Sequence, residues 1–182
     1  MTPNALVLTP MGLRFQGRSY PCSIGRGGVR QDKREGDAAT PAGQYHVTAL
    51  YYRPDRLSTP APWAIPILPG DLWCDDPDHP AYNHHVRAPF AASHESLRRP
   101  DPLYDLVLAT DWNWPDAQPG RGSAIFIHQW RRPGYPTAGC IALARRDLIA
   151  IAAVAAPGTP LIVPGGVARF APRAGAKAQR GD

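Results

Sequence analysis

The sequence lacks long apolar runs, and no stretch approaches the ~20 consecutive apolar residues that a membrane-spanning helix requires. Residues 1–17 also lack the basic n-region, the long apolar core and the small-residue cleavage site that are typical of a secretory signal peptide. We therefore expect no transmembrane segment, and nothing in this stretch indicates export.

Cysteine is scarce, and the three cysteines have no zinc-like spacing. They are Cys22, Cys74 and Cys140, and an odd count leaves at least one thiol free. A disulfide between Cys22 and Cys74 stays open, although buried free thiols are the simpler expectation. We expect no cofactor.

Positive charge exceeds negative charge, with 20 Lys and Arg against 15 Asp and Glu and a net charge of +5. The basic residues are scattered and form no dense block interleaved with aromatic residues, so we expect no nucleic-acid partner. Residues 25–30 (GRGGVR) lack the Lys-Ser/Thr ending and the following helix of a nucleotide-binding loop, which favours a turn.

Glycine and proline are abundant, at 17 and 22 residues of 182, which favours short strands and turns over long helices. One stretch, residues 145–155, predicts a helix with an apolar face formed by Leu148, Ile151, Ala152 and Ala155. The predicted strands include residues 5–9, 19–24, 44–50, 103–110 and 124–127. We therefore expect a single, mainly β domain of mixed sheets with one supporting helix.

Residues 51–102 form a proline-rich stretch with few apolar runs, and we interpret it as a cap over a substrate site. Tyr82 and Asn83 within it are candidates for substrate contacts, or for pinning the loop. Residues 93–98 predict the start of a short helix with Ser93 as its N-cap.

The same stretch contains an alternative chemistry, because several of its side chains are of the types that bind metals. Their spacing matches no helical His-x-x-x-His pair, which favours a solvated acidic turn over a metal site. We expect no metal, and a metal-dependent hydrolase stays as the alternative. The side chains concerned are Asp75, Asp76, Asp78, His79, His84 and His85, with His94 and Glu95 nearby.

The chemistry we favour lies in residues 123–143 (SAIFIHQWRRPGYPTAGCIAL), which predict a strand, a polar loop and a second strand. The first strand ends at His128 and the second begins after Cys140. A thiolate is a strong nucleophile, and a nearby imidazole can accept its proton. Spacing alone leaves a second interpretation open, in which Cys140 is a small buried hydrophobic residue.

Three motifs, which follow one another along the chain in the family's order, resemble those of the L,D-transpeptidase (YkuD) family, the cysteine enzymes that cross-link peptidoglycan. The first comprises His128, Thr137, Gly139, Cys140 and Ile141. The second is residues 36–45 (GDAATPAGQY), and the third is residues 157–163 (PGTPLIV). The chain departs from the family at Ala138, where the family has histidine, and at Ala142, where Arg or Asn is common.

The resemblance implies that Cys140 is the nucleophile, that His128 is its base, and that Thr137, Ala138 and Gly139 form the oxyanion loop. It also implies a peptidoglycan stem tetrapeptide or muropeptide as partner, attacked beside the L-centre of a diamino acid, with a thioester intermediate and release of D-alanine. Attack by water on the thioester would make the protein an L,D-carboxypeptidase or endopeptidase. Ala138 keeps open a non-catalytic peptidoglycan-binding module.

The resemblance also sets the expected organisation. We expect a catalytic domain over residues 1–165, with residues 51–102 as its cap, a flexible tail over residues 166–182, and a monomer. Peptidoglycan chemistry implies the cell envelope, whereas the lack of a visible signal peptide leaves a cytoplasmic location as the alternative.

Overall fold

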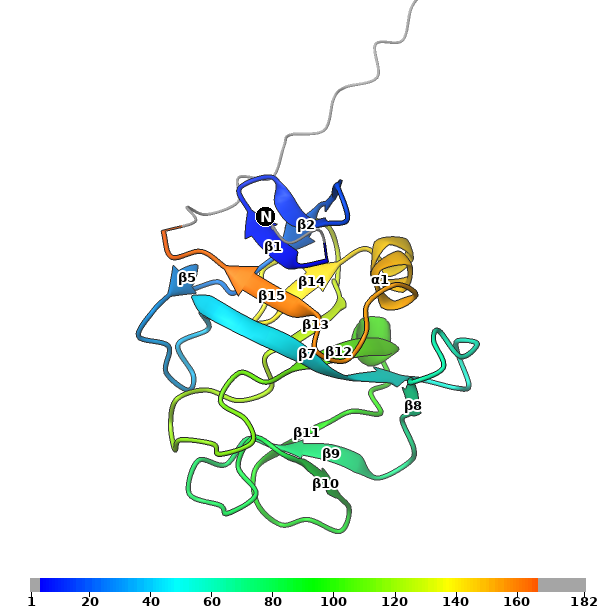
Figure 1. Ribbon diagram of the computed structural model, residues 1–182. Coiled ribbons are helices and arrows are strands. Elements are labelled where there is room, and N and C mark those ends of the chain that lie inside the picture. Colours follow the sequence, from blue (N-terminus) through cyan, green and yellow to red (C-terminus); the bar gives the residue numbers. More distant parts are fainter. Residues whose placement is uncertain (1–3, 167–182) are drawn as a thin grey trace, which may run out of the picture.

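A mixed sheet of ten strands forms the body of the molecule in the computed structural model, which describes residues 4–166 (Figure 1). The strand order is β3-β2-β1-β15-β7-β12-β13-β14-β4, and β8 pairs with the end of β7. The strands are β1 Leu6–Thr9, β2 Gly12–Phe15, β3 Arg18–Tyr20, β4 Cys22–Ser23, β7 Gly43–Tyr52, β8 Ile65–Pro66, β12 Leu106–Thr110, β13 Phe126–Gln129, β14 Ile141–Leu143 and β15 Pro160–Val163. The predicted mainly β fold is confirmed.

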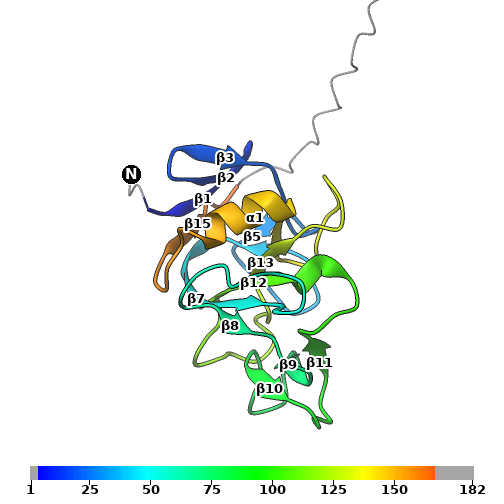
Figure 2. The ribbon, with the colours of Figure 1, turned by 90° about the vertical axis from the view of Figure 1, so that its right-hand side faces the viewer.

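A second, three-stranded sheet lies beside the large one (Figure 2), in the order β10-β9-β11. Its strands are β9 Asp71–Cys74, β10 His85–Arg87 and β11 His94–Ser96. The remaining elements are the short parallel pair β5 Val29–Arg30 and β6 Thr40–Pro41, the 3₁₀ helix η1 Pro102–Tyr104, and the helix α1 Arg145–Ala152. All three strands of the small sheet therefore come from residues 51–102, the stretch that we interpreted as a cap.

Strand β12 is buried on both faces, and this places the two sheets relative to one another. Successive side chains of a strand point to opposite faces. Leu106 and Leu108 join the large core that α1 covers, whereas Val107 and Ala109 join a second core together with Trp73 of β9. The small sheet thus covers the face of β12 and β13 that α1 leaves open.

The predicted helix has the predicted face but ends three residues early. Its apolar residues are buried against the large core, as is Ala155 just beyond its end. The helix ends at Ala152 because the N–H groups of Val154 and Ala155 both bond to the carbonyl of Ile151 in a closing turn. Pro157 follows, and it cannot continue a helix.

Two predicted strands are shorter than expected. Residues 19–24 are split at Pro21, which has no N–H for a ladder, so β3 pairs with β2 while β4 pairs with β14. Residues 103–110 begin as η1, whose N-cap Asp101 accepts a hydrogen bond from the N–H of Leu103, and β12 starts only at Leu106.

The short helix predicted over residues 93–98 is wrong. Residues 94–96 form β11, whose backbone pairs with β9 across the small sheet. His94 and Ser96 are exposed while Glu95 between them is half-buried, which is the alternation of a strand. Pairing with a distant strand overrides the local helix-start signal here.

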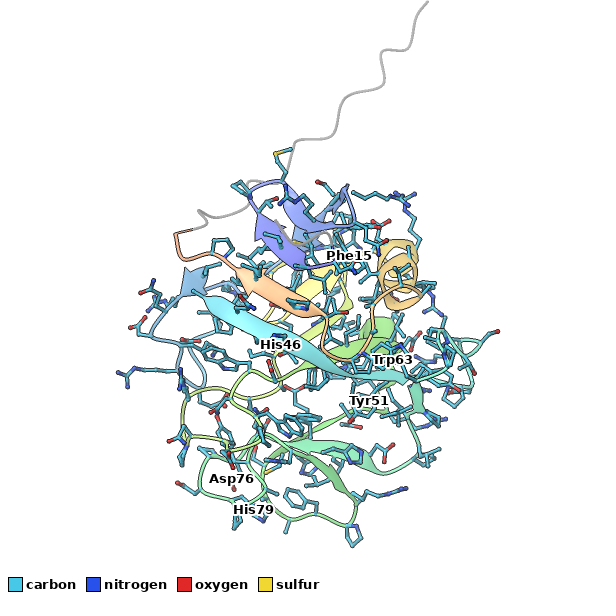
Figure 3. The ribbon with its side chains drawn as sticks, in the orientation of Figure 1. Phe15, His46, Tyr51, Trp63, Asp76 and His79 are labelled. Carbon is cyan, nitrogen blue, oxygen red and sulfur yellow. The ribbon has the colours of Figure 1, made fainter. Side chains whose placement is uncertain are left out.

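The metal alternative has no support among residues 4–166, where no group of three or more His, Cys, Asp or Glu side chains is arranged to hold a metal ion. Asp76 and His79 lie in the loop at the far end of the small sheet (Figure 3), and the ring of His79 packs on Phe90. Within the same residues, no helix has the length and apolarity to cross a membrane. Residues 167–182 of the predicted tail lie outside the described part.

Candidate active site

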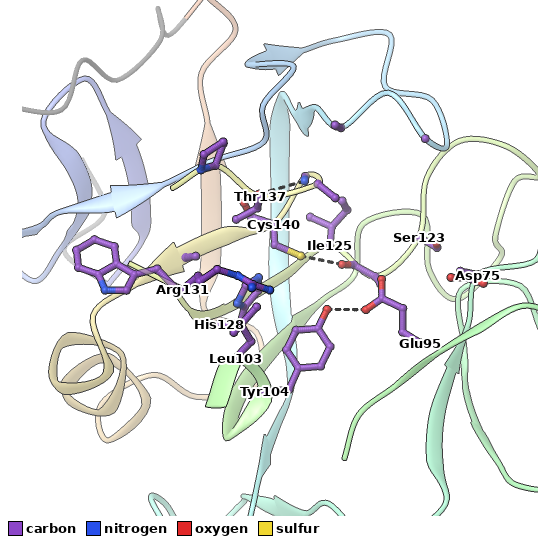
Figure 4. Close-up of a pocket in the computed structure, with 18 of the residues that line it drawn as sticks. Asp75, Glu95, Leu103, Tyr104, Ser123, Ile125, His128, Arg131, Thr137 and Cys140 are labelled. Atoms are coloured by element: carbon purple, nitrogen blue, oxygen red, sulfur yellow. Dashed lines mark hydrogen bonds between the residues drawn. The ribbon is translucent and has the colours of Figure 1, made fainter. Parts of the chain in front are cut away.

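A pocket of about 500 Å³ contains both residues of the predicted catalytic pair (Figure 4). One side is formed by the main sheet, with His128 in β13 and Cys140 just before β14. The small sheet and the segment after it supply the facing side, with Asp75, Glu95 and Tyr104. The pocket therefore lies between the body of the domain and the predicted cap.

The pairing of β13 with β14 brings His128 and Cys140 together. The two strands are parallel, with Ile127 opposite Ile141 and His128 opposite Ala142. Cys140 lies two residues before Ala142 and so shares its face of the sheet with His128. The sequence predicted two neighbouring strands, one with an imidazole and one with a thiol at its edge. The observed pairing of β13 with β14 agrees with this prediction.

The Cys140 thiol is nearly buried, with 9% of the residue exposed. Its S–H donates to the carbonyl of Ala124 at 3.1 Å, and its sulfur accepts from the N–H of Phe126 at 3.4 Å. Burial, together with the negative charge of Glu95, raises the pKa of Cys140 to about 12. The thiol is therefore protonated near neutral pH and needs a base before it can attack.

The orientation of His128 is fixed by a main-chain carbonyl. Its Nδ1 lies 2.7 Å from the carbonyl oxygen of Gln129, and since a carbonyl only accepts, Nδ1 carries the proton. The Nε2 lone pair is then available as a proton acceptor. Burial lowers the pKa of His128 to about 4, so the ring is neutral near pH 7. The Tyr104 ring packs edge-on against it, with centroids 5.3 Å apart.

Two features fix the loop before Cys140. The side chain of Thr137 makes hydrogen bonds within the loop, and Gly139 lies very close to the backbone of Ala39. Thr137 Oγ1 donates to the carbonyl of Cys140 at 2.6 Å and accepts from the N–H of Gly139 at 3.1 Å. Gly139 has φ of +144°, and a Cβ there would lie 2.9 Å from the carbonyl oxygen of Ala39. Only glycine fits this position, while the neighbouring Ala138 is exposed.

A model of a known family covers the residues of this pocket. The model for the L,D-transpeptidase catalytic domain (YkuD) matches residues 13–163, which include all the pocket residues described above. The chain belongs to this family. Among solved structures, an L,D-transpeptidase from Mycobacterium smegmatis is similar at 15% identity and a TM-score of 0.42, over 87% of this chain and 57% of that one. This chain therefore spans little more than half the length of that neighbour. No curated protein matches it.

In this L,D-transpeptidase domain, Tyr82 and Asn83 lie outside the pocket lining. Asn83 is 2% exposed, and its Oδ1 accepts from Trp73 Nε1 and from the N–H of Ala124. Its Nδ2 donates to the carbonyls of Trp112 and Asn113. Asn83 thus pins three segments together, which corresponds to the loop-pinning alternative rather than to substrate contact.

Tyr82 has a similar bridging position in the domain. Its hydroxyl donates to Glu35 and accepts from the N–H of Gly122 at 3.0 Å. Ser123 Oγ donates to the same Glu35 oxygen at 2.8 Å. Tyr82 therefore fixes the segment that leads into β13 and forms a hydrogen bond with Glu35, a carboxylate of the pocket lining. Tyr82 itself is not part of that lining.

Sequence reasoning missed several residues that line the pocket of this L,D-transpeptidase domain. Asp75 and Glu95 appeared only as metal-ligand candidates, and Tyr104 only as part of a strand. The alternation of exposed His94 and Ser96 around Glu95 was the available signal, because a strand there directs Glu95 inward. The signal depended on reading residues 94–96 as a strand.

The Thr40-Pro41 motif has a physical role in the domain, because Thr40 connects two loops across 99 residues of sequence. Its Oγ1 accepts from the N–H of Gly25 at 2.9 Å and donates to the carbonyl of Gly139 at 2.8 Å, and the residue is fully buried. We expect Thr40→Val to lower the free energy of unfolding by about 2–4 kcal/mol, because two buried groups lose their partners. Chemical denaturation measures this change.

Thr48→Val is the matched control for that substitution. Thr48 is half-buried in β7, and its side chain makes no hydrogen bond to any residue in the range 4–166. Its replacement should change the free energy of unfolding by no more than about 0.5 kcal/mol. Equal effects of the two substitutions would show that the hydrogen bonds of Thr40 do not hold the Gly139 loop.

Proposed function

We propose that this domain is a cysteine-dependent L,D-transpeptidase that forms a thioester between Cys140 and a peptidoglycan stem peptide. The observation that carries the proposal is the common pocket of Cys140 and His128, in which the Gln129 carbonyl leaves Nε2 as the acceptor nitrogen. Family membership supports the reaction class. Ala138 stands where the family has histidine, but this difference removes neither Cys140 nor His128.

In the proposed first half-reaction, Nε2 of His128 takes the proton from Cys140 while the sulfur attacks the carbonyl carbon at the L-centre of the diamino acid. Main-chain N–H groups of the loop around Gly139 stabilise the oxyanion. The C–N bond to the terminal D-alanine breaks, and His128 returns the proton to the leaving amine. The thioester remains on Cys140.

In the second half-reaction, an amine of another stem attacks the thioester carbon, forming an amide while the C–S bond breaks. The proton lost by the amine reaches the sulfur through His128, which restores the thiol. Water in place of the amine would give an L,D-carboxypeptidase from the same intermediate. The acceptor therefore decides between transfer and hydrolysis.

Intact-protein mass spectrometry tests the proposal. We expect incubation with a disaccharide tetrapeptide to add the mass of the substrate minus D-alanine, and an acceptor amine to remove the adduct and yield a cross-linked product. Loss of the adduct to water alone would reassign the domain as a hydrolase. Binding of the muropeptide without any adduct would support the non-catalytic module instead.

A further inference from the structure

A single arginine side chain holds both ends of residues 100–105, which contribute to the pocket wall. Arg56 lies in the loop between β7 and β8. At the first end of the segment, its guanidinium donates to the carbonyls of Pro100 at 3.0 Å and Asp101 at 3.1 Å. At the second end, its Nη1 donates to the carboxylate of Asp105 at 2.8 Å. The planar fork of one guanidinium therefore closes this segment into a loop.

Residues 100–105 lie beside the imidazole of His128. The segment contains η1, and the ring of Tyr104 at the end of η1 packs edge-on against His128, with centroids 5.3 Å apart (Figure 4). Asp101 and its ion-pair partner Arg99 act electrostatically on the same imidazole, in opposite directions. The surroundings of the His128 ring thus depend on how this segment is held.

The carboxylate of Asp105 anchors the arrangement to the rest of the domain. The residue is 3% exposed, and its two oxygens accept from two different arginines, Oδ1 from Arg56 and Oδ2 from Arg145 at 2.7 Å. Arg145 is the first residue of α1, and its Nη2 donates to the main-chain carbonyl of Arg56 at 3.1 Å. The network therefore joins α1 and the loop after β7 to the segment beside His128.

We propose that Arg56 is a positioning residue for His128, because it fixes the Tyr104 ring against the imidazole and so keeps that imidazole buried in one orientation. Arg56 is outside the pocket lining, so it acts through residues 100–105 and not on the substrate. Its effect on catalysis rests on the proposed function, whereas its effect on the His128 ring does not. Without the fork the segment has more conformational freedom, and water reaches the imidazole and favours its charged form.

Titration of the His128 ring by NMR tests this positioning without any substrate. In Arg56→Gln we expect the pKa of His128 to rise from about 4 towards its ordinary value near 6.5, because the ring becomes more hydrated. The variant should still fold, since Asp105 keeps its ion pair with Arg145. The neutral ring should also lose its single tautomer, in which Nδ1 carries the proton.

Arg98→Gln is the matched control and should leave the pKa of His128 unchanged. The side chains of Arg98 and Arg56 are 31% and 30% exposed, and Arg98 pairs with Asp55 outside the pocket lining. Arg56→Lys is the second variant, since it keeps a charge beside Asp105 and so protects the fold. One ammonium group does not reproduce the planar fork, so we expect a raised pKa of His128 in this variant too.

The rate of thioester formation at Cys140 gives a second readout. In Arg56→Gln its kcat should fall about 10 to 100-fold while KM stays within about twofold, because a displaced base affects the chemical step and not binding. An unchanged pKa of His128 in either Arg56 variant overturns the inference, even where thermal stability falls. A raised pKa without any loss of kcat also overturns it. A raised pKa in a protein whose parent forms no thioester would leave the inference about the ring standing and refute the proposed function.

Discussion

Cys140→Ala is expected to abolish the acyl-enzyme, slowing loss of D-alanine from a stem tetrapeptide by about 10⁴-fold or more, as removal of a nucleophile does elsewhere. The reason is chemical, since alanine has no atom to form the thioester. The fold should persist, because a nearly buried cysteine behaves as a small apolar residue and its S–H bond to Ala124 is weak. Intact-protein mass and the thermal midpoint measure the two effects.

Cys74→Ala is the matched control for that substitution. Cys74 is a fully buried free thiol of β9 and lies outside the pocket lining. Its replacement should leave the adduct unchanged. An adduct that persists in Cys140→Ala would assign the nucleophile to another residue, and peptide mapping would then locate it.

The placement of His128 and Cys140 in one pocket was predictable from the sequence because its parts are local. A short apolar run before His128 and another after Cys140 predict two strands, and parallel pairing of those strands is enough to place both side chains on one face. The single helix had an equally local signal in its apolar face. Such features depend on residues within one or two turns or strands.

The pocket wall opposite Cys140 was not predictable in the same way. Strands β9, β10 and β11 have only three or four residues each, and their pairing partners lie outside their own sequence neighbourhood. Residues 93–98 carry a helix-start signal that tertiary pairing overrides. The contact of Thr40 with Gly139 spans 99 residues, and no periodicity encodes it.

The orientation of His128 is a further feature that side-chain patterns do not contain. The group that fixes its Nδ1 is the carbonyl of Gln129, which every residue type would supply. Family motifs therefore locate the candidate reacting side chains, while the protonation states of these side chains depend on burial and on backbone geometry.

His128→Gln is expected to slow acylation of Cys140 by about 10² to 10⁴-fold, the usual contribution of a positioned general base. Glutamine can occupy much of the same space, but its amide does not accept a proton near neutral pH. In the unmodified protein, the acylation rate should fall only as pH approaches about 4, where buried His128 becomes protonated. Quenched-flow or stopped-flow mass analysis across pH 4–8 measures both effects.

A separate prediction concerns how the free energy of unfolding of the parent protein and of His128→Gln depends on pH. His128 titrates at about 4 in the folded chain and near its ordinary value of 6.5 in the unfolded chain. Between these values the unfolded state binds a proton that the folded state does not, so the free energy of unfolding falls as pH falls from 6.5 towards 4. This contribution is complete above pH 6.5 and amounts to about 3 kcal/mol.

His128→Gln should remove this part of the pH dependence, which denaturation curves at several pH values measure against the parent protein. His94→Gln is the matched control, because His94 is an exposed histidine of β11. The raised pKa of Glu95 acts in the opposite direction and is present in all three proteins, so the comparison between them isolates His128. Parallel stability curves for the parent and His128→Gln would show that burial does not hold the imidazole of His128 neutral in the folded protein.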